Sequence, residues 1–370
     1  MTLAELALLT RQMRERLAAA RRSIGSGGFE WYPYDSLGNL ANLERAFGAH
    51  YLSAFDTARG RRVADIGCGD GDLAFFLESL GCEVDAIDFP DSNHNGMQAI
   101  RTLKRQLASK IEIAEVDLDS QFKLPRERYD LIVFLGILYH LKNPLYVLER
   151  LAMHARFCVL STRVARYFPN DKPMPQDQPI AYLLGADELN RDESNFWIFS
   201  HAGLKRLTER AHWKILSYAS VGDTKLSIPV GAKRDERVFC LLESHYALAN
   251  VDLVFGWHAP EIGGTRWTAK QFAARIHLLG LAGPDRIRMR VYVPEDLLER
   301  LGPRRVEIAI EGVPCAPAIL DQPGYQEIVR RFRARGKRSL MAVFQLDNAL
   351  APDTTDDRER GMVVVDLAVE

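Results

Sequence analysis

The feature that constrains this chain most is a group of glycines and aspartates at the end of a short apolar run. Residues 63–72 read VADIGCGDGD, with an apolar segment before the glycines and a helical pattern after them. Glycines at a strand-to-helix turn let the backbone bend sharply and approach a bound nucleotide closely. The segment therefore predicts an open α/β sheet that binds a nucleotide-like ligand at the carboxyl ends of its strands.

The spacing and charge of this turn narrow the choice of ligand. Its glycines are spaced G-x-G-x-G, whereas dinucleotide-binding folds use G-x-G-x-x-G. Asp65, Asp70 and Asp72 surround the turn, and their carboxylates would repel a pyrophosphate. S-adenosylmethionine (SAM) carries a sulfonium cation and an α-amino group and has no phosphate. We therefore expect SAM at this turn, rather than NAD or FAD.

Around the turn, short apolar runs alternate with helical patterns, which predicts a mostly parallel sheet covered by helices on both faces. Strands are expected at 62–66, 83–88, 111–116, 131–135 and 157–161, and helices at 72–80, 97–107, 145–154 and 201–211. Two later strands, at 213–219 and 238–243, are separated only by a loop. We expect them to pair antiparallel and to give the sheet one reversed strand at its end. A reversed last strand distinguishes the methyltransferase version of this architecture from the dehydrogenase version.

The pattern differs on either side of this α/β region, which is expected to span 56–247. Residues 1–55 contain two helical segments and the aromatic sequence FEWYPYDSLGNL, and predict a helical and aromatic cap. Residues 250–370 show short strands separated by Gly, Pro and Asp, without helical crossovers. This predicts an all-β, jelly-roll-like sandwich. Its strands are expected at 251–255, 287–292, 306–310, 340–345 and 362–368. The predicted fold class is α/β, with a Rossmann-like sheet and a C-terminal β-sandwich.

Two acidic residues extend the expected cofactor site. Asp88 ends the second strand, where its carboxylate can accept hydrogen bonds from both ribose hydroxyls, although it could instead only cap a loop. Asp117 follows the third strand, where a carboxylate or nearby backbone can meet the adenine amino group. The expected cofactor-binding residues are Asp65, Gly67, Cys68, Gly69, Gly71, Asp88, Asp117 and Leu135.

With these residues in view, 30–245 resemble class I SAM-dependent methyltransferases. Within this superfamily, the wobble-uridine tRNA methyltransferases and carboxymethyltransferases have segments similar to FLGILYHLKNPLYVLERL and NFWIFSHAGLKRLTERAHWKIL of this chain. The segment WYPYDSLGN resembles that group more loosely. The resemblance implies a SAM-dependent methyltransferase. An open α/β sheet would bind the acceptor beyond the carboxyl ends of its strands.

Methyl transfer requires alignment of the acceptor and, for some acceptors, removal of a proton. Tyr139 and His140 follow the fourth strand at the expected site. His140 has a suitable ordinary pKa for accepting a hydroxyl proton, and a structural histidine is the alternative. Tyr139 could orient the acceptor or pack beneath the loop. These two residues are the expected catalytic residues.

Aromatic and amide residues are expected around the acceptor. Trp31, Tyr32 and Tyr34 could close over the methyl donor, or they could be core residues. By the resemblance, Asn195 and Trp197 would line the acceptor side; a turn residue and a core aromatic are the alternatives. No histidine or cysteine pattern has metal-ligand spacing, so no metal is expected.

The C-terminal sequences FGWHAPEIGGTRWTAKQFA and RERGMVVVDLAVE resemble β-sandwich modules found beside enzymes of bacterial surface polysaccharide synthesis. A sugar platform could form from Trp257, His258, Glu261, Arg266 and Trp267. Alternatively, the tryptophans anchor the sandwich, and the module only docks a partner or forms a homodimer.

Charge and hydropathy limit the partners. Lys and Arg number 48 against 49 Asp and Glu, a balance that disfavours a nucleic-acid partner. The best phosphate-contact candidate is the basic run at 330–338, for which a solvated loop or helix face is the favoured interpretation. We find no apolar run long enough to span a bilayer and no signal-peptide pattern, and the five scattered cysteines fit reduced thiols. We therefore expect a cytoplasmic protein.

The expected activity is methyl transfer to an oxygen, or less favourably a nitrogen, of a small-molecule or glycan acceptor. Two alternatives stay open. One is a methyltransferase of the tRNA wobble-uridine type, as the subgroup resemblance suggests. The other is a glycan-binding or assembly protein whose SAM site is vestigial.

Overall fold

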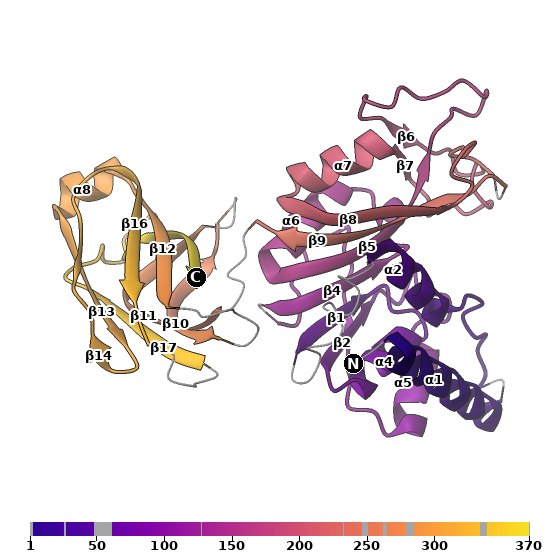
Figure 1. The fold of residues 1–370 in the computed structure, drawn as a ribbon, viewed down its shortest axis with the longest axis horizontal. Coiled ribbons are helices and arrows are strands. Elements are labelled where there is room, and N and C mark those ends of the chain that lie inside the picture. The colour runs from indigo at the N-terminus through magenta and orange to yellow at the C-terminus, as the bar shows by residue number, and fades with distance from the viewer. Residues whose placement is uncertain are drawn as a thin grey trace. The chain divides into compact units, whose positions relative to one another are not determined.

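The computed structural model describes residues 3–25, 27–47, 61–126, 128–231, 233–245, 251–261, 265–278, 285–333 and 339–369. The chain divides into two compact units, Met1–His245 and Tyr246–Glu370 (Figure 1). Part of the second helical segment predicted in the cap and part of the basic run at 330–338 lie outside the described residues. No helix in the described ranges is long and apolar enough to cross a membrane.

The first unit is built on a nine-stranded sheet with the order β3-β2-β1-β4-β5-β7-β6, to which β9 and β8 are added beside β5. Its parallel strands are β1 (Arg62–Ile66), β2 (Glu83–Asp88), β3 (Glu112–Glu115), β4 (Tyr129–Leu135) and β5 (Ala155–Ala165). Almost every residue of β1 and β2 is buried, as expected for parallel strands covered on both faces. The predicted Rossmann-like sheet is therefore confirmed.

The reversed last strand is also confirmed, although it does not lie at the edge of the sheet. β9 (Glu236–Ser244) pairs antiparallel with β5 along one side and with β8 (Trp213–Gly222) along the other. Helix α7 (His201–Arg210) precedes β8, so β8 runs in the direction of β5 after a crossover. The hairpin that follows then inserts β9 between them.

Helices cover the faces of this sheet. They are α1 (Leu3–Ile24), α2 (Asn39–Phe47), α4 (Asp72–Ser79), α5 (Gln98–Leu107), α6 (Pro144–His154) and α7. Figure 1 shows α1 beside α4 and α5, where Leu6, Met13 and Leu17 of α1 are buried in the main core. Helix α7 starts where the sequence predicts, because the Ser200 side chain accepts a hydrogen bond from the Gly203 backbone N–H at 3.0 Å.

Several short elements of the first unit were not predicted. They are the 3₁₀ turns η1 (Ser36–Gly38) and η2 (Leu138–His140) and the strands β6 (Ala181–Leu183) and β7 (Trp197–Ser200). Strand β7 pairs with the last residues of β5, and β6 pairs antiparallel with β7. Together with η2, they build up the carboxyl-end side of the sheet.

In its described residues, the second unit is all-β except for helix α8 (Glu295–Leu301). Its strands are β10 (Val251–Pro260), β11 (Arg266–His277), β12 (Arg286–Val293), β13 (Arg304–Ile310), β14 (Val313–Pro314), β15 (Ala318–Leu320), β16 (Gly324–Arg331), β17 (Ser339–Leu346) and β18 (Val363–Val369). They form one antiparallel, sandwich-like sheet with the order β14-β13-β17-β11-β18-β12-β16, with β10 beside β11 and β15 beside β13. Its core contains the stacked rings of Phe272 and Phe344, with centroids 4.8 Å apart. The predicted β-rich C-terminal fold is confirmed.

Candidate functional site

The glycine loop connects β1 to α4, and its glycines are required by both conformation and space. Gly67, Gly69 and Gly71 have φ values of +73°, +56° and +85°. A Cβ on Gly67 would lie 2.1 Å from the Ile137 side chain, and one on Gly71 would lie 2.6 Å from that of Ile100. Only glycine fits such positions without strain. Because Ile137 directly precedes η2, the loop lies against the segment that carries the predicted catalytic residues.

Asp88, at the end of β2, is bonded to this loop. Its carboxylate accepts hydrogen bonds of 2.9 Å from the backbone N–H groups of Gly69 and Phe89 and from the Asn93 side-chain amide. Burial raises the pKa of Asp88 above its ordinary value, and these donors oppose the rise. The carboxylate is therefore fixed in orientation beside the glycine loop.

Asp65, the last acidic residue of β1, is buried with only 4% of its surface exposed. It accepts a hydrogen bond from the Ala74 backbone, but its Oδ2 has no partner among the described residues. Burial and the negative charge of Asp88 raise the pKa of Asp65 to about 7. A buried acceptor without a donor costs free energy, so a ligand that brings a cationic N–H group would be stabilised here.

The two other aspartates of the loop interact with the N-terminal cap. Arg21 lies 2.5 Å from Asp72 and 3.5 Å from Asp70, and the Tyr32 backbone N–H donates to Asp70 at 2.9 Å. Their negative charge is therefore compensated within the protein. Of the three aspartates, only Asp65 has no cationic partner within the described ranges. The electrostatic preference for a positively charged ligand thus depends on fewer carboxylates than the sequence suggests.

A cluster of Tyr32, Tyr139 and Arg237 lies beside the glycine loop. The Tyr32 ring comes within 3.5 Å of the position that a Cβ on Gly69 would occupy. Burial and the neighbouring Tyr139 raise the pKa of Tyr32 to about 12, so its hydroxyl is neutral at physiological pH. The two terminal nitrogens of Arg237 each lie 3.5 Å from the Tyr139 hydroxyl. The cap, the turn η2 and the reversed strand therefore meet at this point.

The sequence pattern alone did not indicate Arg237 as a site residue. It lies at the start of β9, where its Nε is 3.5 Å from Asp235, a carboxylate that Arg163 also contacts at 3.2 Å. One signal was available, because an arginine opens the apolar run of the strand that was correctly predicted to be reversed. The antiparallel direction of β9 brings the beginning of that strand to the edge where the parallel strands end.

His140 lies next to this cluster and is half-buried. Its ring contacts that of Tyr139, with centroids 4.3 Å apart. Its Nδ1 is 3.0 Å from the Ser194 hydroxyl and 3.2 Å from the Ser194 carbonyl oxygen. Burial lowers the pKa of His140 below its ordinary value. The imidazole is therefore neutral near pH 7 and able to accept a proton.

The three aromatic residues predicted as a lid have different surroundings. Tyr32 covers Gly69, as described above. Tyr34 is 69% exposed and contacts Tyr32 edge-on, with centroids 5.3 Å apart. Trp31 packs against the main core and donates a hydrogen bond to the Gly25 carbonyl at 3.2 Å. Trp31 thus has the contacts of a structural residue.

Asn195 and Trp197, predicted on the acceptor side, are both used in internal hydrogen bonds. The buried Asn195 amide donates to the carbonyl oxygens of Leu189 and Asp192 at 3.3 and 3.0 Å. The Trp197 indole donates to the Lys142 carbonyl at 3.3 Å. The Asn195 bonds fix the segment before β7, and the Trp197 bond holds β7 against the segment after η2.

The remaining residues predicted for the cofactor lie in less distinctive positions. Asp117 is half-buried and accepts a hydrogen bond from the Asp119 backbone at 2.9 Å. Cys68 is buried with its Sγ 4.0 Å from Asp88 Oδ2. Leu135 packs against the main core. No group of three His, Cys, Asp or Glu side chains in the described part of the chain could hold a metal ion.

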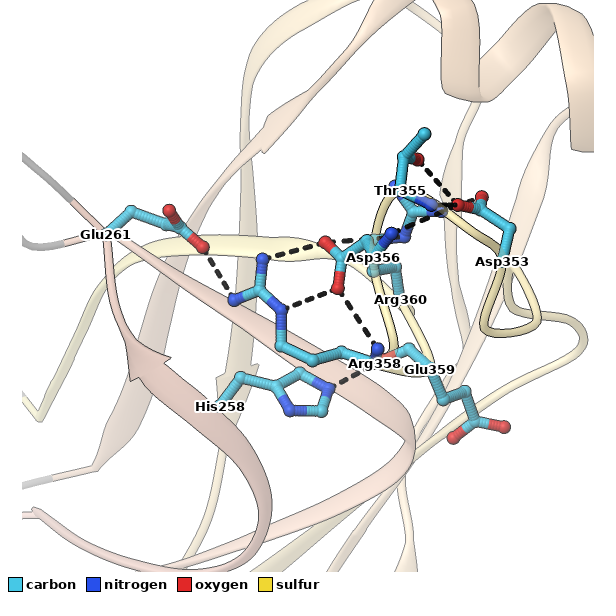
Figure 2. A network of polar contacts seen from close by, with 8 residues as sticks. All are labelled: His258, Glu261, Asp353, Thr355, Asp356, Arg358, Glu359 and Arg360. Atoms are coloured by element: carbon cyan, nitrogen blue, oxygen red, sulfur yellow. Dashed lines mark hydrogen bonds and ion pairs between the residues drawn. The ribbon is translucent and has the colours of Figure 1, made fainter.

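In the second unit, the residues considered as a sugar platform make internal contacts. Trp257 donates to the Ala273 carbonyl at 2.7 Å and packs edge-on against Phe272. Figure 2 shows His258 and Glu261 turned toward the loop at 353–360. His258 Nε2 lies 2.6 Å from the carbonyl oxygen of Glu359.

The same loop contains a network of ion pairs. Arg358 lies 2.7 Å from Glu261 and 2.8 Å from Asp356, and Arg360 lies 2.6 Å from Asp353 (Figure 2). These charged groups satisfy one another within the unit. Asp353, Asp356, Arg358 and Arg360 of this loop are therefore engaged in contacts inside the unit.

Comparison with known proteins agrees with this geometry. Residues 39–218 match the model of a family described as a methyltransferase domain. No curated protein is significantly similar to the chain in sequence.

Several solved structures have a similar fold. The N-terminal domain of EvdMO1, crystallised in the presence of SAH and D-fucose, is 13% identical; the match covers 63% of this chain and 97% of that chain, with a TM-score of 0.42. Magnesium protoporphyrin IX methyltransferase (ChlM) from Synechocystis PCC 6803 with bound SAM is 18% identical; the match covers 60% of this chain and 89% of that chain, with a TM-score of 0.38. The [4+2]-cyclase SpnF is 11% identical; the match covers 63% of this chain and 94% of that chain, with a TM-score of 0.39. Such low similarity concerns the fold alone.

The family match covers the glycine loop and most of the parallel strands around it. The reversed β9 and the acidic glycine loop are the two features that the sequence led us to expect of a methyltransferase. The chain therefore contains a class I SAM-dependent methyltransferase domain, in which the matched residues 39–218 lie.

Proposed function

We propose that this enzyme transfers the methyl group of SAM to an oxygen atom of a small-molecule or glycan acceptor. The observation that carries the proposal is the position of His140 beside the glycine loop, with one ring nitrogen bonded to Ser194. A hydroxyl acceptor must lose its proton as the new C–O bond forms, and a neutral imidazole is suited to receive that proton.

The SAM site that we propose is centred on the glycine loop. Asp65 would accept a hydrogen bond from the α-amino group of SAM, because its Oδ2 is buried and has no donor within the described residues. Asp88 would accept from the ribose hydroxyls. The full proposed set comprises Asp65, Gly67, Cys68, Gly69, Gly71, Asp88, Asp117 and Leu135. When bound, SAM supplies a methyl group activated by its positively charged sulfur.

The protein groups around this site would act mainly by orientation and by removal of a proton. Tyr139 would orient the acceptor hydroxyl, and Arg237 would hold the Tyr139 hydroxyl in place. Tyr32 would cover the loop and exclude water from the donor. His140 would take the acceptor proton on the ring nitrogen that does not face Ser194. Tyr34, Asn195, Trp197 and Trp31 would support this site from outside, through the contacts described above.

We further propose that residues 1–55 act as a cap for the methyltransferase domain at 56–247. Arg21 and Tyr32 support this role, because both contact aspartates of the glycine loop. The β-rich domain at 250–370 would dock a partner or a second copy of the chain. The internal contacts of Trp257 and His258 favour this role over a sugar platform.

The proposal is tested with purified protein and isotopically labelled SAM. Fractionated small molecules, glycans and bulk tRNA would be offered separately as acceptors, and S-adenosylhomocysteine would be measured alongside the label. Label in a small-molecule or glycan fraction, on an oxygen, would support the proposal. Label confined to tRNA, or to a nitrogen atom, would contradict the acceptor assignment. Untargeted metabolite and glycan profiling of a deletion strain would then identify the acceptor.

A further inference from the structure

Ser194, in the segment before β7, provides two oxygen atoms to His140. Ser194 presents its carbonyl oxygen at 3.2 Å and its hydroxyl oxygen at 3.0 Å to the same ring nitrogen, Nδ1. A carbonyl oxygen can only accept a hydrogen bond. The carbonyl therefore favours the form of the imidazole in which Nδ1 carries the proton.

A serine hydroxyl can either donate a hydrogen bond to Nδ1 or accept one from it, and Asp192 decides between the two. The Ser194 hydroxyl donates its proton to Asp192 Oδ1 at 2.6 Å, and the Ser194 backbone N–H donates to the same oxygen at 3.0 Å. A hydroxyl has only one proton to donate. With that proton directed at the carboxylate, the hydroxyl oxygen faces His140 as an acceptor as well.

We propose that Asp192 and Ser194 are positioning residues that hold His140 in the tautomer with a proton on Nδ1 and a free lone pair on Nε2. A neutral imidazole carries one ring proton, so fixing that proton on Nδ1 leaves Nε2 as the basic nitrogen. This inference rests on the proposed function, in which His140 accepts the proton of the acceptor. It adds which nitrogen does so and which groups select it.

The surrounding backbone keeps this arrangement in register. The Phe196 backbone N–H donates to the Tyr139 carbonyl at 2.8 Å, and the Asn195 amide donates to the Asp192 carbonyl at 3.0 Å. The first bond joins the segment before β7 directly to η2. Small shifts of the serine relative to the imidazole are therefore resisted from both sides.

Charged groups on both sides of His140 set its proton affinity. Burial lowers the pKa of His140, Asp192 raises it, and Arg237 on β9 lowers it. Asp192 thus acts in two ways: through its hydrogen bond to the serine and through its negative charge. Substitutions at this position can separate the two effects.

The direct test is long-range proton–nitrogen NMR of the full-length protein with ¹⁵N-labelled histidine. The His140 signals would be assigned by their loss in His140→Gln. Above the imidazole pKa, the expected spectrum shows a protonated Nδ1 and an unprotonated Nε2. A proton on Nε2 instead would overturn the proposal. This measurement needs neither SAM nor an acceptor, so its outcome is independent of the proposed function.

Three variants separate the effects of the Asp192 hydrogen bond, the Asp192 charge and the Ser194 hydroxyl on the His140 tautomer. Asp192→Ala frees the serine hydroxyl to donate to Nδ1, and we expect the tautomer with a proton on Nε2 to become detectable. Asp192→Asn retains an oxygen acceptor without the charge, so the tautomer should persist while the imidazole titrates at lower pH. Ser194→Ala retains the backbone carbonyl and should keep the proton on Nδ1. An unchanged tautomer and titration in both Asp192 variants would contradict the positioning role.

Turnover provides the second readout. Asp192→Ala should lower kcat by about tenfold with little change in the KM for SAM, since only part of a general-base contribution is lost. Asp192→Asn should have a kcat close to that of the wild type above pH 7, because the imidazole is neutral there in both proteins. If the tautomer is as expected but His140→Gln retains full activity, the proposed function fails while the structural assignment stands.

Discussion

The hydroxyl of Tyr139 lies 3.5 Å from both terminal nitrogens of Arg237, which links η2, the turn that follows β4, to the start of the reversed strand β9. The guanidinium also lies 5.7 Å from the centroid of the Tyr139 ring. A planar cation close to a tyrosine hydroxyl and ring restricts that side chain to one orientation. The central parallel strands and the reversed strand therefore cooperate in shaping the candidate active site.

This relationship predicts a selective loss of activity in Arg237→Gln. Without the guanidinium, Tyr139 loses its cationic neighbour, and we expect kcat to fall by about tenfold or more, as for the loss of a positioning group. SAM affinity should change much less than kcat. Arg234→Gln is the matched control, because Arg234 pairs with Asp171 at the surface. Equal kinetics for the two variants would argue against a role of Arg237 in the site.

A second prediction concerns the buried carboxyl of Asp65. Its pKa is about 7 in the folded protein, against an ordinary value of 3.8, so the folded state holds a proton that the unfolded state has lost. The free energy of unfolding contributed by this group therefore falls as pH rises from about 4 to 7. Asp65→Asn lacks this dependence, and we expect its Tm to exceed that of the wild type more at pH 8 than at pH 5. An identical difference at both pH values would show that Asp65 does not titrate in this range.

The same carboxyl should make SAM binding depend on pH. A cationic ligand favours the ionised form, so binding near pH 6 releases a proton, and SAM affinity should rise between pH 6 and 8. Calorimetry in buffers of different ionisation enthalpy measures the released proton directly. Asp65→Asn should bind SAM more weakly and release no proton at this site. Proton release that persists undiminished in this variant would point to another group.

Asp88 provides a third prediction. Asp88→Ala removes the proposed partner of the ribose hydroxyls and the acceptor for the Gly69 backbone N–H. We expect SAM binding to weaken by about 1–3 kcal/mol, the usual cost of losing a hydrogen bond to a charged group. Asp91→Ala, at an exposed position in the following turn, serves as the control. Equal affinities of the two variants would exclude Asp88 from the SAM site.

The glycine loop itself can be tested through stability. Gly67 and Gly96 both have positive φ values, +73° and +61°, but a Cβ on Gly67 would collide with Ile137, whereas nothing lies within 4 Å of one on Gly96. Alanine at either position is destabilised by the positive φ angle, and only Gly67→Ala adds a steric clash. We expect urea unfolding to show about 1–3 kcal/mol more destabilisation for Gly67→Ala. Equal losses would mean that the Ile137 contact is not maintained in solution.

The alternating apolar and helical pattern was sufficient to predict most of the α/β unit. Strands β1 and β2 have the predicted bounds, and α4 and α7 are each one residue shorter. The short strands β6 and β7 could not be predicted, because each contains only a few residues and depends on pairing with the end of β5. Local sequence carries little information about such pairings.

The C-terminal unit shows the same limit more strongly. β11 has the sequence RWTAKQFAARIH, whose Ala, Lys, Gln and Arg residues favour helix, yet it pairs with β10, β17 and β18. Its Phe272, Ala273, Ala274 and Ile276 are all buried, so the strand shows no strict alternation of apolar and polar residues. Tertiary pairing therefore overrides propensity in this strand, and β16 was missed for a related reason, as its outward face is mixed in polarity.

In the candidate site, the residues predicted best were those that the backbone itself requires. The glycines and Asp88 have local signatures that a sequence can reveal. The roles of Arg237 and Ser194 have no such signature, because they depend on partners, Tyr139 and His140, that are distant in sequence and adjacent only in the folded unit. The pairing of Arg21 with Asp72 was equally hidden, since it joins the first helix to the loop.

The most direct test of this account is calorimetry of the purified chain with SAM and NAD. SAM should bind, and its affinity should fall in Asp65→Asn and Asp88→Ala, while NAD should show no binding, because it brings a pyrophosphate to a loop with an uncompensated carboxylate. Tight binding of NAD together with no detectable binding of SAM would contradict the central claim that this acidic glycine loop is a SAM site.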